Sequence, residues 1–422
     1  MSKPYVTLIG KAVRYAARLR GGGSALPGLF VEKIDPDFIR DTLSHLPHGV
    51  VLISGTNGKT TTTKMVVALL ESQGMKVFTN RTGSNFSRGV AAALLGDVDN
   101  RGRLDADIAV LELDEAHAVN FVEHIPPKYS LLLNVMRDQL DRFGEIDKTA
   151  GMLRSIAKAT TGTVVLNRED PRVRAIANDV TTPVHYFGLD DTLRQVFPSD
   201  DTLHGGDVSS DELPDADVSL KKFEGSSATF TIGKESVTTD LKLDGIYNIY
   251  NAAAALTLTK VIVGDQLDQA ALLKQLSQVT PAFGRGEKIV VGNQPLELVL
   301  VKNPSGFRLG LQSFDPAGYA TMIAINDNYA DGRDMSWLWD VDFSSLKQAG
   351  VAEITGIRAY DMALRMQYDE IDVSHIDTDP ARALQHFISN NSEKPKRIYC
   401  TYTVMLALRR ELSKITDVEV IS

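Results

Sequence analysis

Cysteine is almost absent from this chain of 422 residues. Cys400 is the only one in the sequence. The chain can therefore form no internal disulfide and no zinc site built from several cysteines. So few thiols are typical of a reducing compartment such as the cytoplasm. Cys400 lies in the strand-like stretch 397–402 without a glycine turn beside it, so we expect a buried, inert thiol and not a nucleophile.

Long apolar runs and an excess of positive charge are missing as well. We find no run of about 18 apolar residues, which a membrane-spanning helix requires, and the N-terminus lacks the continuous apolar stretch of a signal peptide. The net charge of −9 argues against nucleic acid as a partner. With 43% hydrophobic and 23% charged residues, the composition is that of a globular protein. The length suits two or three domains of about 100–200 residues each.

The most informative stretch that is present runs over residues 51–63, with the sequence VLISGTNGKTTTT. Its apolar start predicts a central strand. Gly55 and Gly58 allow a tight turn and a close approach of the backbone to a ligand. Lys59 can reach terminal phosphates, and the Thr60 hydroxyl can join a Mg²⁺ shell. The helix that follows would point its N-terminal amides at the same anion, so the stretch predicts a site for a nucleoside triphosphate.

The loop departs from the general phosphate-binding pattern, because Ile53 stands where that pattern requires a glycine. The shorter form Gly-Thr-Asn-Gly-Lys-Thr resembles that of the Mur ligase family, whose members activate a carboxylate as an acyl phosphate and join it to an amine. A chance Gly-Lys-Thr in a surface turn is the alternative, and the flanking strand and helix argue against it. The loop residues that we expect to bind nucleotide are Gly55, Thr56, Asn57, Gly58, Lys59, Thr60 and Thr61.

Strand and helix patterns alternate from residue 48 to about residue 281, which predicts parallel βαβ units. Ligands in such sheets lie at the carboxyl ends of the strands. We therefore predict an α/β fold with a central parallel sheet, and one site where the strands end. The expected strands are residues 51–54, 76–80, 109–113, 130–134 and 163–167, with a helix over residues 61–73.

Acidic side chains follow two of these strands. Glu112 comes at the end of one strand and is expected to complete the Mg²⁺ shell together with Thr60. The alternative is a charged residue at the start of a helix. Asp138 and Asp141 follow the next strand, where they could orient substrate or a metal-bound water.

Further polar clusters are candidates for contact with the nucleotide. Asn167 and Asp170 follow another strand, and Arg285 begins the C-terminal region. Asn248 and Asn251 are three residues apart, so they share a helix face and could bind an adenine edge. Helix capping and turn formation are the alternative for each cluster taken alone.

Two segments lie outside these motifs. Residues 1–47 form a helical segment in which Lys11, Arg14 and Arg18 recur at helical spacing. This basic face fits either an anionic membrane surface or, as we favour, the solvated face of a packed helix. Residues 190–217 are rich in Asp and Glu and predict a solvated insertion, since they lack calcium-loop spacing.

The predicted domains are therefore residues 1–47, a nucleotide-binding domain over residues 48–284, and a smaller α/β domain over residues 285–422. Strands are expected in the last of these at residues 296–301, 319–325, 353–356 and 397–400.

Several longer motifs then appear in one order along the chain. They are Leu-Glu-Leu-Asp-Glu around Glu112, and the stretches 137–147, 245–251, 301–306 and 327–337. With the glycine loop they resemble the MurT family, the ligase subunits of lipid II isoglutaminyl synthase, over residues 5–410. The last two stretches separate this type from ordinary Mur ligases.

The resemblance implies a function. Such subunits use ATP and Mg²⁺ to phosphorylate the α-carboxylate of D-glutamate in the lipid II stem peptide, and ammonia then gives D-isoglutamine. The ammonia comes from glutamine, hydrolysed by a partner glutaminase of the GatD type. The resemblance assigns catalysis to Lys59 and Glu112. It also implies that Asp334 completes the catalytic triad of the partner, which would dock on the C-terminal domain. An ion pair with Arg333 or an exposed turn is the alternative for Asp334.

The chain also departs from the family. Many members carry a four-cysteine zinc ribbon where this chain has its acidic segment, so no zinc is expected here. Two rival functions remain: a free-standing Mur-type or folylpolyglutamate-type amino-acid ligase, and a nucleotide-binding scaffold without chemistry. The preferred precursor (lipid II, lipid I or a soluble form) stays open, as does contact with the inner face of the cell membrane.

Overall fold

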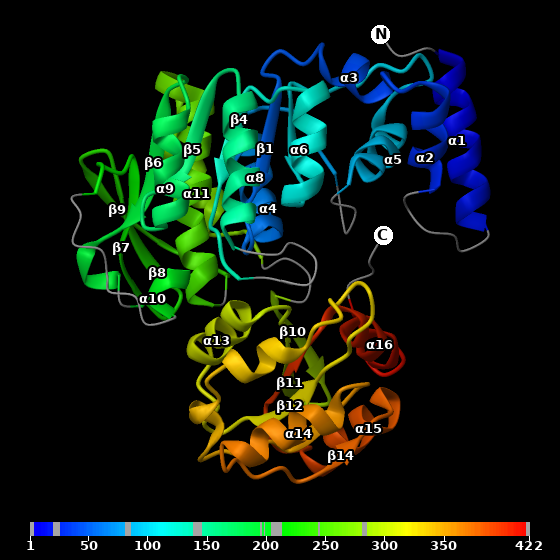
Figure 1. Ribbon diagram of the computed structural model, residues 1–422, viewed down its shortest axis with the longest axis vertical. Helices are drawn as coiled ribbons and strands as arrows, with labels where there is room; N and C mark the ends of the chain where they lie inside the picture. The colour runs from blue at the N-terminus through cyan, green and yellow to red at the C-terminus, as the bar shows by residue number, and fades with distance from the viewer. Residues whose placement is uncertain are drawn as a thin grey trace. The chain divides into compact units, whose positions relative to one another are not determined.

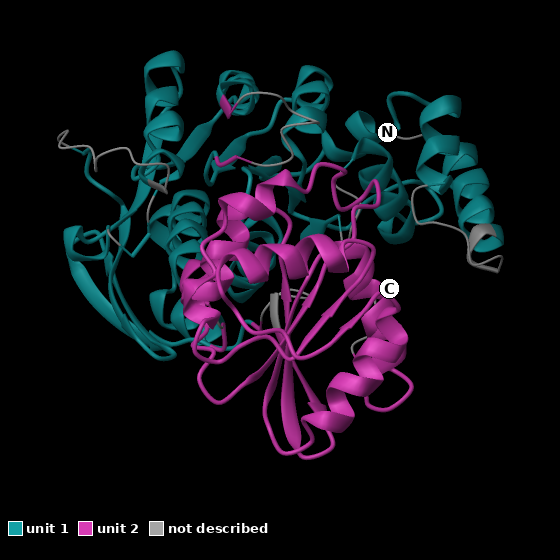
Figure 2. Ribbon diagram, turned by 60° about the horizontal axis from the view of Figure 1, so that its bottom comes forward, with its two compact units in different colours: residues 1–135, 147–241, 249–279 teal, residues 136–146, 242–248, 280–422 magenta. Residues whose placement is uncertain are grey.

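The computed structural model describes residues 4–19, 26–80, 86–137, 146–194, 196–197, 199–203, 213–243, 245–280 and 285–418. These residues form two compact units (Figure 2). Unit 1 comprises residues 1–135, 147–241 and 249–279, and unit 2 comprises residues 136–146, 242–248 and 280–422. Each unit is built on its own sheet (Figure 1).

The sheet of unit 1 has the strand order β2-β3-β1-β4-β5-β6-β7-β8-β9. Its first seven strands in this order are parallel, as predicted for alternating strands and helices. All residues of the central strand β1 are buried, which explains its continuous apolar sequence. The parallel strands are β1 (Val50–Ser54), β2 (Val77–Thr79), β3 (Ile108–Glu112), β4 (Tyr129–Leu132), β5 (Thr163–Asn167), β6 (Val184–Leu189) and β7 (Val218–Glu224).

Beyond the predicted parallel strands, the sheet continues at one edge with antiparallel strands. Strands β7, β8 (Ser227–Ile232) and β9 (Glu235–Asp240) pair antiparallel. Two-residue loops join them, and each loop begins with a glycine at positive φ, Gly225 at 56° and Gly233 at 61°. Such glycines are a signature of tight hairpins, and this signal was present in the sequence but not used.

Helices connect the strands of unit 1. Their bounds are α1 (Pro4–Leu19), α2 (Leu26–Ile34), α3 (Phe38–Leu43), α4 (Lys59–Ser72), α5 (Ser87–Asp97), α6 (Glu115–His124), α8 (Ile146–Ala159), α9 (Pro171–Ala175), α10 (Asp200–Leu203), α11 (Ile246–Val263) and α12 (Gln269–Leu276), with 3-10 turns η1 (Ile176–Asp179), η2 (Asp191–Leu193) and η3 (Gly264–Gln266). The segment Ile246–Gln266 corrects the claim that no long apolar stretch exists, because it is long and apolar enough to cross a membrane. Two-thirds of its best window is buried, which is typical of a core helix.

The N-terminal helix turns basic side chains toward the protein. Nζ of Lys11 donates a hydrogen bond of 2.7 Å to the carbonyl oxygen of Val98, just after α5. Arg14 lies against Gly96 of α5, where an added Cβ would stand 2.1 Å from its Nη1. The side chain of Arg18 lies outside the described residues. The two described cations therefore favour the packed helix over the membrane surface.

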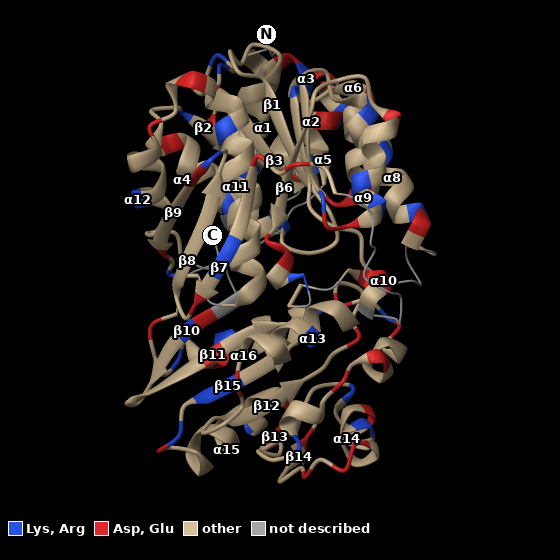
Figure 3. Cartoon of the chain, turned by 90° about the vertical axis from the view of Figure 1, so that its left-hand side faces the viewer, with Lys and Arg blue, Asp and Glu red and all other residues tan. Residues whose placement is uncertain are grey.

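The acidic segment is more integrated than its composition predicts. Phe197 is buried, and its ring packs on Phe223 and Tyr250 at centroid distances of 6.0 and 5.3 Å. Asp200 is buried, and Asp201 pairs at 2.6 Å with Arg172, which lies outside the segment. At Phe197 and Asp200 the expectation of a solvated insertion was wrong. Elsewhere acidic and basic residues are interspersed on the helices of both units (Figure 3).

Unit 2 has a smaller sheet of strand order β10-β11-β15-β12-β13-β14. Only the β10–β11 pair is antiparallel among its described strands. The strands are β10 (Arg285–Val291), β11 (Gln294–Leu300), β12 (Ala320–Ala324), β13 (Glu353–Thr355), β14 (Ile376–Asp377) and β15 (Lys396–Cys400). The helices are α13 (Pro304–Ser313), α14 (Ala359–Tyr368), α15 (Pro380–Asn390) and α16 (Tyr402–Leu412), with 3-10 turns η4 (Ser336–Asp340) and η5 (Ser344–Leu346).

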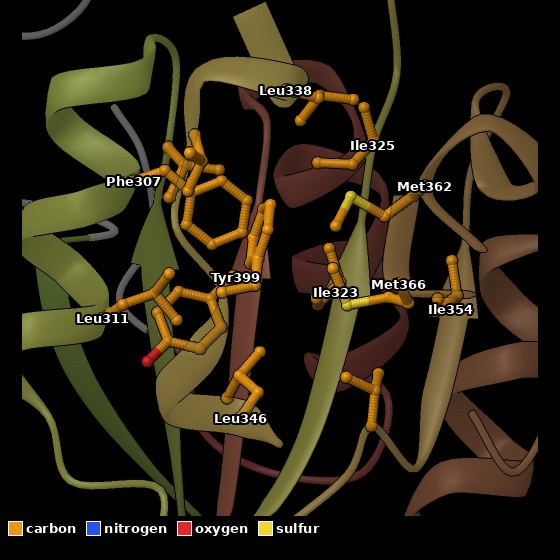
Figure 4. Close-up of a cluster of buried hydrophobic side chains, with 14 of the residues drawn as sticks. Phe307, Leu311, Ile323, Ile325, Leu338, Leu346, Ile354, Met362, Met366 and Tyr399 are labelled. Atoms are coloured by element: carbon orange, nitrogen blue, oxygen red, sulfur yellow. The ribbon is translucent and has the colours of Figure 1, made fainter. Parts of the chain in front are cut away.

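The hydrophobic core of unit 2 surrounds β12 and β15. Phe307 packs on Phe343 and Tyr399 at centroid distances of 5.0 and 5.3 Å, and Met362 and Met366 of α14 join the same cluster (Figure 4). Cys400 belongs to a second cluster of unit 2. It is fully buried, as predicted, and burial raises the pKa of its thiol far above the ordinary value.

Candidate nucleotide-binding and catalytic site

The glycine loop of unit 1 turns the chain sharply between β1 and α4. Gly55 has φ +133° and Gly58 has φ +89°, a left-handed region that favours glycine. A Cβ on Gly55 would lie 3.0 Å from the backbone N of Asn134. A Cβ on Gly58 would lie 2.5 Å from Nδ2 of Asn251. The loop is thus shaped by two glycines, and α4 begins directly after it with its amides at the carboxyl end of β1.

The substitution Gly58→Ala is expected to weaken ATP binding by about tenfold or more, equivalent to about 1.4 kcal/mol. Alanine would be strained at this φ and would push against the Asn251 amide. Gly74→Ala is the matched control, because Gly74 has φ +85° at the other end of α4 with nothing within 4 Å of an added Cβ. Calorimetric titration with ATP and Mg²⁺ measures both. Equal affinities for the two variants would show that close packing at Gly58 does not shape the site.

Lys59 and Thr60 meet acidic side chains from β3 and α6. Nζ of Lys59 donates to the carbonyl oxygens of Gly55 and Thr56, and it lies 3.4 Å from Oε2 of Glu115. The Thr60 hydroxyl donates a hydrogen bond of 2.8 Å to Oε1 of Glu112. Both buried carboxylates thus lie beside the loop, because β1 and β3 are neighbours and Ile53 pairs with Glu112.

This arrangement has the chemical parts of a phosphate and metal site. A hydroxyl and a carboxylate 2.8 Å apart are hard oxygen ligands of the kind that Mg²⁺ prefers. An ammonium beside them can neutralise phosphate charge. The residues present therefore fit Mg²⁺ and a nucleotide, and binding of the metal by Thr60 and Glu112 stays a prediction. Glu115 was not among the predicted site residues. Its signal was its place three residues beyond the end of β3.

Two asparagines hold the loop and the strand ends together, and neither was among the predicted site residues. Asn134 accepts from the Asn57 amide at 2.8 Å through Oδ1 and donates to the Asn57 carbonyl at 3.0 Å. Asn80 exchanges two hydrogen bonds with the backbone of Glu112, at 2.7 and 2.9 Å. Both follow a strand by one or two residues. Because ligands bind where parallel strands end, this position could have marked them as candidates in the sequence. They fix the positions of the loop and of Glu112.

Asn167 and Asp170 are used for internal hydrogen bonds. Asn167 donates to the Leu133 carbonyl at 2.8 Å and accepts from the Tyr250 hydroxyl at 2.6 Å. Asp170 accepts from the Val135 amide at 2.7 Å and caps the N-terminus of α9. Burial raises the pKa of Asp170 to about 6, although three backbone amides oppose this shift. These contacts match the capping alternative, and binding of nucleotide by either residue stays a prediction.

The raised pKa of Asp170 predicts a pH dependence of stability. Because the folded chain binds this proton more tightly than the unfolded chain, the contribution of Asp170 is greatest below pH 4 and falls as the pH rises toward 6. Relative to Asp170→Asn, the free energy of unfolding of unit 1 should fall by about 2 kcal/mol between roughly pH 4.5 and pH 7. Urea unfolding at the two pH values measures this.

Asp379→Asn provides the control for the loss of a helix-capping carboxylate. Asp379 caps α15 in the same Asp-Pro context, but its side chain is 44% exposed. Its substitution should change stability without a comparable trend across this pH range. A constant difference between the wild type and Asp170→Asn at both pH values would contradict the assignment to Asp170.

Of the remaining candidate residues, the structure describes some and leaves others outside its described part. Asn251 is buried in α11 against Gly58, and Asn248 lies three residues earlier in the same helix. The Thr61 hydroxyl is buried without a hydrogen-bond partner among the described residues. Asp138 and Asp141 lie outside the described residues. So does the side chain of Arg285, whose backbone opens β10.

The loop between β12 and η4 carries the second candidate group, in unit 2. Asp331 is buried and anchors the loop, accepting from the Thr403 amide at 2.7 Å. Asp334 is exposed and accepts from the Ser336 amide at 2.9 Å. Hydrogen bonds from the Ser336 hydroxyl and amide hold the pKa of Asp334 below its ordinary value. The described residues show no ion pair between Asp334 and Arg333, so its carboxylate faces solvent in ionised form.

Comparison with known proteins identifies the family of the chain. The family model of the Mur ligase middle domain matches residues 53–259, and the MurT ligase C-terminal model matches residues 300–405. Over 96% of both chains, the sequence is 30% identical to the lipid II isoglutaminyl synthase (glutamine-hydrolyzing) subunit MurT of Streptococcus pneumoniae. The chain belongs to the MurT family.

Solved structures place the MurT chain in the Mur ligase fold. A pseudomurein peptide ligase type C from Methanothermus fervidus matches with a TM-score of 0.68, 17% identity, and coverage of 90% of this chain and 81% of that one. The Mycobacterium tuberculosis folylpolyglutamate synthase complexed with ADP and AMPPCP matches with a TM-score of 0.63, 17% identity, and coverage of 91% and 94%. At such identities these likenesses show the fold alone.

Each matched region contains one group of candidate site residues. The middle-domain match contains the glycine loop, Glu112 and Asn251. The C-terminal match contains Asp334 and its anchor Asp331. The MurT chain thus combines a nucleotide-type loop in unit 1 with an exposed carboxylate loop in unit 2.

Proposed function

We propose that this chain is the ligase subunit of a glutamine-dependent amidating enzyme that converts the D-glutamate of lipid II to D-isoglutamine. The observation that carries the proposal is that one chain contains both the Lys59–Thr60–Glu112 cluster and a MurT-type C-terminal region. The Streptococcus pneumoniae relative bears this function in its name, and the present chain matches it over nearly its whole length. The reaction would take place in the cytoplasm, where ATP is available.

The chemistry begins with a carboxylate, which is a poor acyl acceptor. Transfer of the γ-phosphoryl group of ATP to this carboxylate would give an acyl phosphate, and ammonia would then displace phosphate to form the amide. Lys59 would neutralise charge on the transferred group, and Thr60 and Glu112 would hold Mg²⁺. Bound there, Mg²⁺ would supply charge neutralisation at the phosphate oxygens. Gly58 would let the backbone approach the phosphates.

Unit 2 offers a surface that fits a protein partner. Trp339 follows Asp334 by five residues and is 47% exposed, and its ring lies 5.2 Å from that of Tyr368. Tyr360 and Leu364 of α14 are also exposed. Exposed aromatic residues of this kind are enriched where proteins associate. They support docking of a class I glutaminase of the GatD type beside Asp334.

Reconstitution with such a glutaminase tests the proposal. Lipid II incubated with both chains, ATP, Mg²⁺ and glutamine should become lighter by the difference between a hydroxyl and an amino group. The change should require both chains with glutamine, and only this chain with free ammonia. Parallel reactions with lipid I and the soluble precursor would identify the preferred substrate.

Two outcomes would favour the rivals. ATP consumption only when an amino acid is offered would indicate a free-standing ligase of the Mur or folylpolyglutamate type. An intact complex without ATP consumption under any condition would indicate a scaffold.

A further inference from the structure

Two histidines and one glutamate converge in unit 2, outside the sites described above. Glu353 opens β13, His375 precedes β14, and His386 lies in α15. Nδ1 of His375 is 2.8 Å from one carboxylate oxygen of Glu353, and Nδ1 of His386 is 2.7 Å from the other. The two imidazole rings stack with centroids 3.9 Å apart. Three separate segments thus bring possible ligand atoms within 4.8 Å of one another.

The burial of these groups is unequal, and this matters for their chemistry. The Glu353 side chain is fully buried, while those of His375 and His386 are 40% and 43% exposed. A buried carboxylate is costly unless positive charge or hydrogen bonds compensate it. A single divalent ion would compensate the carboxylate and bind both imidazoles in neutral form.

The nearby cation of α15 is already paired with carboxylates other than Glu353. Arg382 is the nearby cation of α15, and it pairs with Asp377 at 2.8 Å and with Asp379 at 3.5 Å. Its charge is therefore already matched by two carboxylates. The candidate ligand atoms of Glu353, His375 and His386 all lie within 4.8 Å of one another.

We propose that Glu353, His375 and His386 bind a divalent transition-metal ion, with zinc the best match to two imidazoles and one carboxylate. Zinc binds nitrogen and carboxylate oxygen at about 2.0–2.2 Å, so its ligand atoms lie roughly 3.3 Å apart. The nitrogen–oxygen distances of 2.8 and 2.7 Å are shorter than this spacing by about half an ångström, so zinc binding would require the half-exposed rings to move. Solvent on their exposed side would fill the remaining positions. This ligand set contains no cysteine, so it is unrelated to the zinc ribbon whose absence the sequence predicts.

The ion would fasten the edge of the sheet. Strand β14 is the edge strand and has only two residues, Ile376 and Asp377. The metal would link the residue before it to β13 and α15. Binding should therefore raise the melting temperature of the chain as well as order this edge.

Zinc titration of the chelator-treated full-length chain tests the proposal. By calorimetry at about pH 7.5, the wild type should bind one equivalent with a Kd of about 10 µM or tighter. Removal of either histidine, in His375→Gln or His386→Gln, should weaken binding by at least about tenfold. Zinc at about 100 times its Kd should raise the melting temperature of the wild type by roughly 5 °C. Affinity should fall with decreasing pH, because protons compete for the imidazoles.

His185→Gln is the matched control. His185 also pairs with a carboxylate, Asp217 at 2.9 Å, and is 37% exposed, but it lies in unit 1 without a second histidine. It should bind zinc as the wild type does. Glu353→Gln keeps a side chain of the same shape and serves if a histidine variant folds poorly, and it too should lose affinity. Unchanged affinity in the His375→Gln/His386→Gln double variant, or no binding up to about 100 µM zinc, would overturn the assignment.

Discussion

Lys59→Ala should lower ATP-dependent amidation by at least about 10²–10³-fold, the usual cost of removing one group that stabilises transition-state charge. The Lys59 ammonium lies in the glycine loop beside the Glu112–Thr60 pair. The rate with free ammonia as nitrogen source measures this effect, because it bypasses the partner glutaminase.

The variant needs a structural control, because Lys59 pairs with the buried carboxylate of Glu115 at 3.4 Å. Loss of one partner of a buried pair destabilises by about 3–5 kcal/mol. The double variant Lys59→Ala/Glu115→Gln removes the orphaned charge and should regain stability without regaining activity. Lys64→Ala, on the exposed face of the same helix, should retain activity. Full activity in Lys59→Ala would contradict the catalytic role of Lys59 and favour the scaffold.

The central fold could be predicted because its signals are local. Strand β5 has the predicted bounds, and β1 and β3 begin within one residue of expectation. Buried parallel strands are continuous apolar runs, and glycines mark where the first of them turns. The hairpins β7–β9 were missed because their polar, half-exposed residues lack that signal, although Gly225 and Gly233 mark their turns.

The candidate site was predicted only in part, for a physical reason. Lys59, Thr60 and Glu112 follow from a motif and from adjacent strand ends. The support by Asn80, Asn134 and Glu115 depends on which strand lies beside which, and the order β2-β3-β1-β4 is a property of the whole sheet. Short polar residues after strands serve turns, caps and sites equally well. Asp170 shows this, since its carboxylate caps α9.

The cluster of Glu353, His375 and His386 was beyond sequence reasoning for the same cause. Its first and last members are separated by more than thirty residues, with no metal-ligand spacing between them. They meet because β13, β14 and α15 pack together at one edge of the sheet of unit 2. In the sequence, each histidine taken alone is typical of a surface residue.

Asp334→Asn should lower amidation with glutamine by roughly 10²–10⁴-fold in the complex and leave amidation with free ammonia unchanged. A carboxylate behind a catalytic histidine fixes its tautomer and stabilises the imidazolium, and an amide of the same shape does not. Asp334 is suited to this, because hydrogen bonds from Ser336 keep its pKa low and its carboxylate ionised. The measurement compares the two nitrogen sources at saturating ATP.

Asp342→Asn provides an unusually close control for that experiment. Asp342 accepts from the Ser344 amide at 2.9 Å, as Asp334 does from Ser336, and its pKa is lowered by the same kind of hydrogen bonds. Both carboxylates are exposed and lie in unit 2. If local capping were all that mattered, the two variants would behave alike with glutamine. A selective loss in Asp334→Asn, with the complex still assembled, would assign its carboxylate to the partner's chemistry. Equal activity in both variants would leave Asp334 as a turn residue.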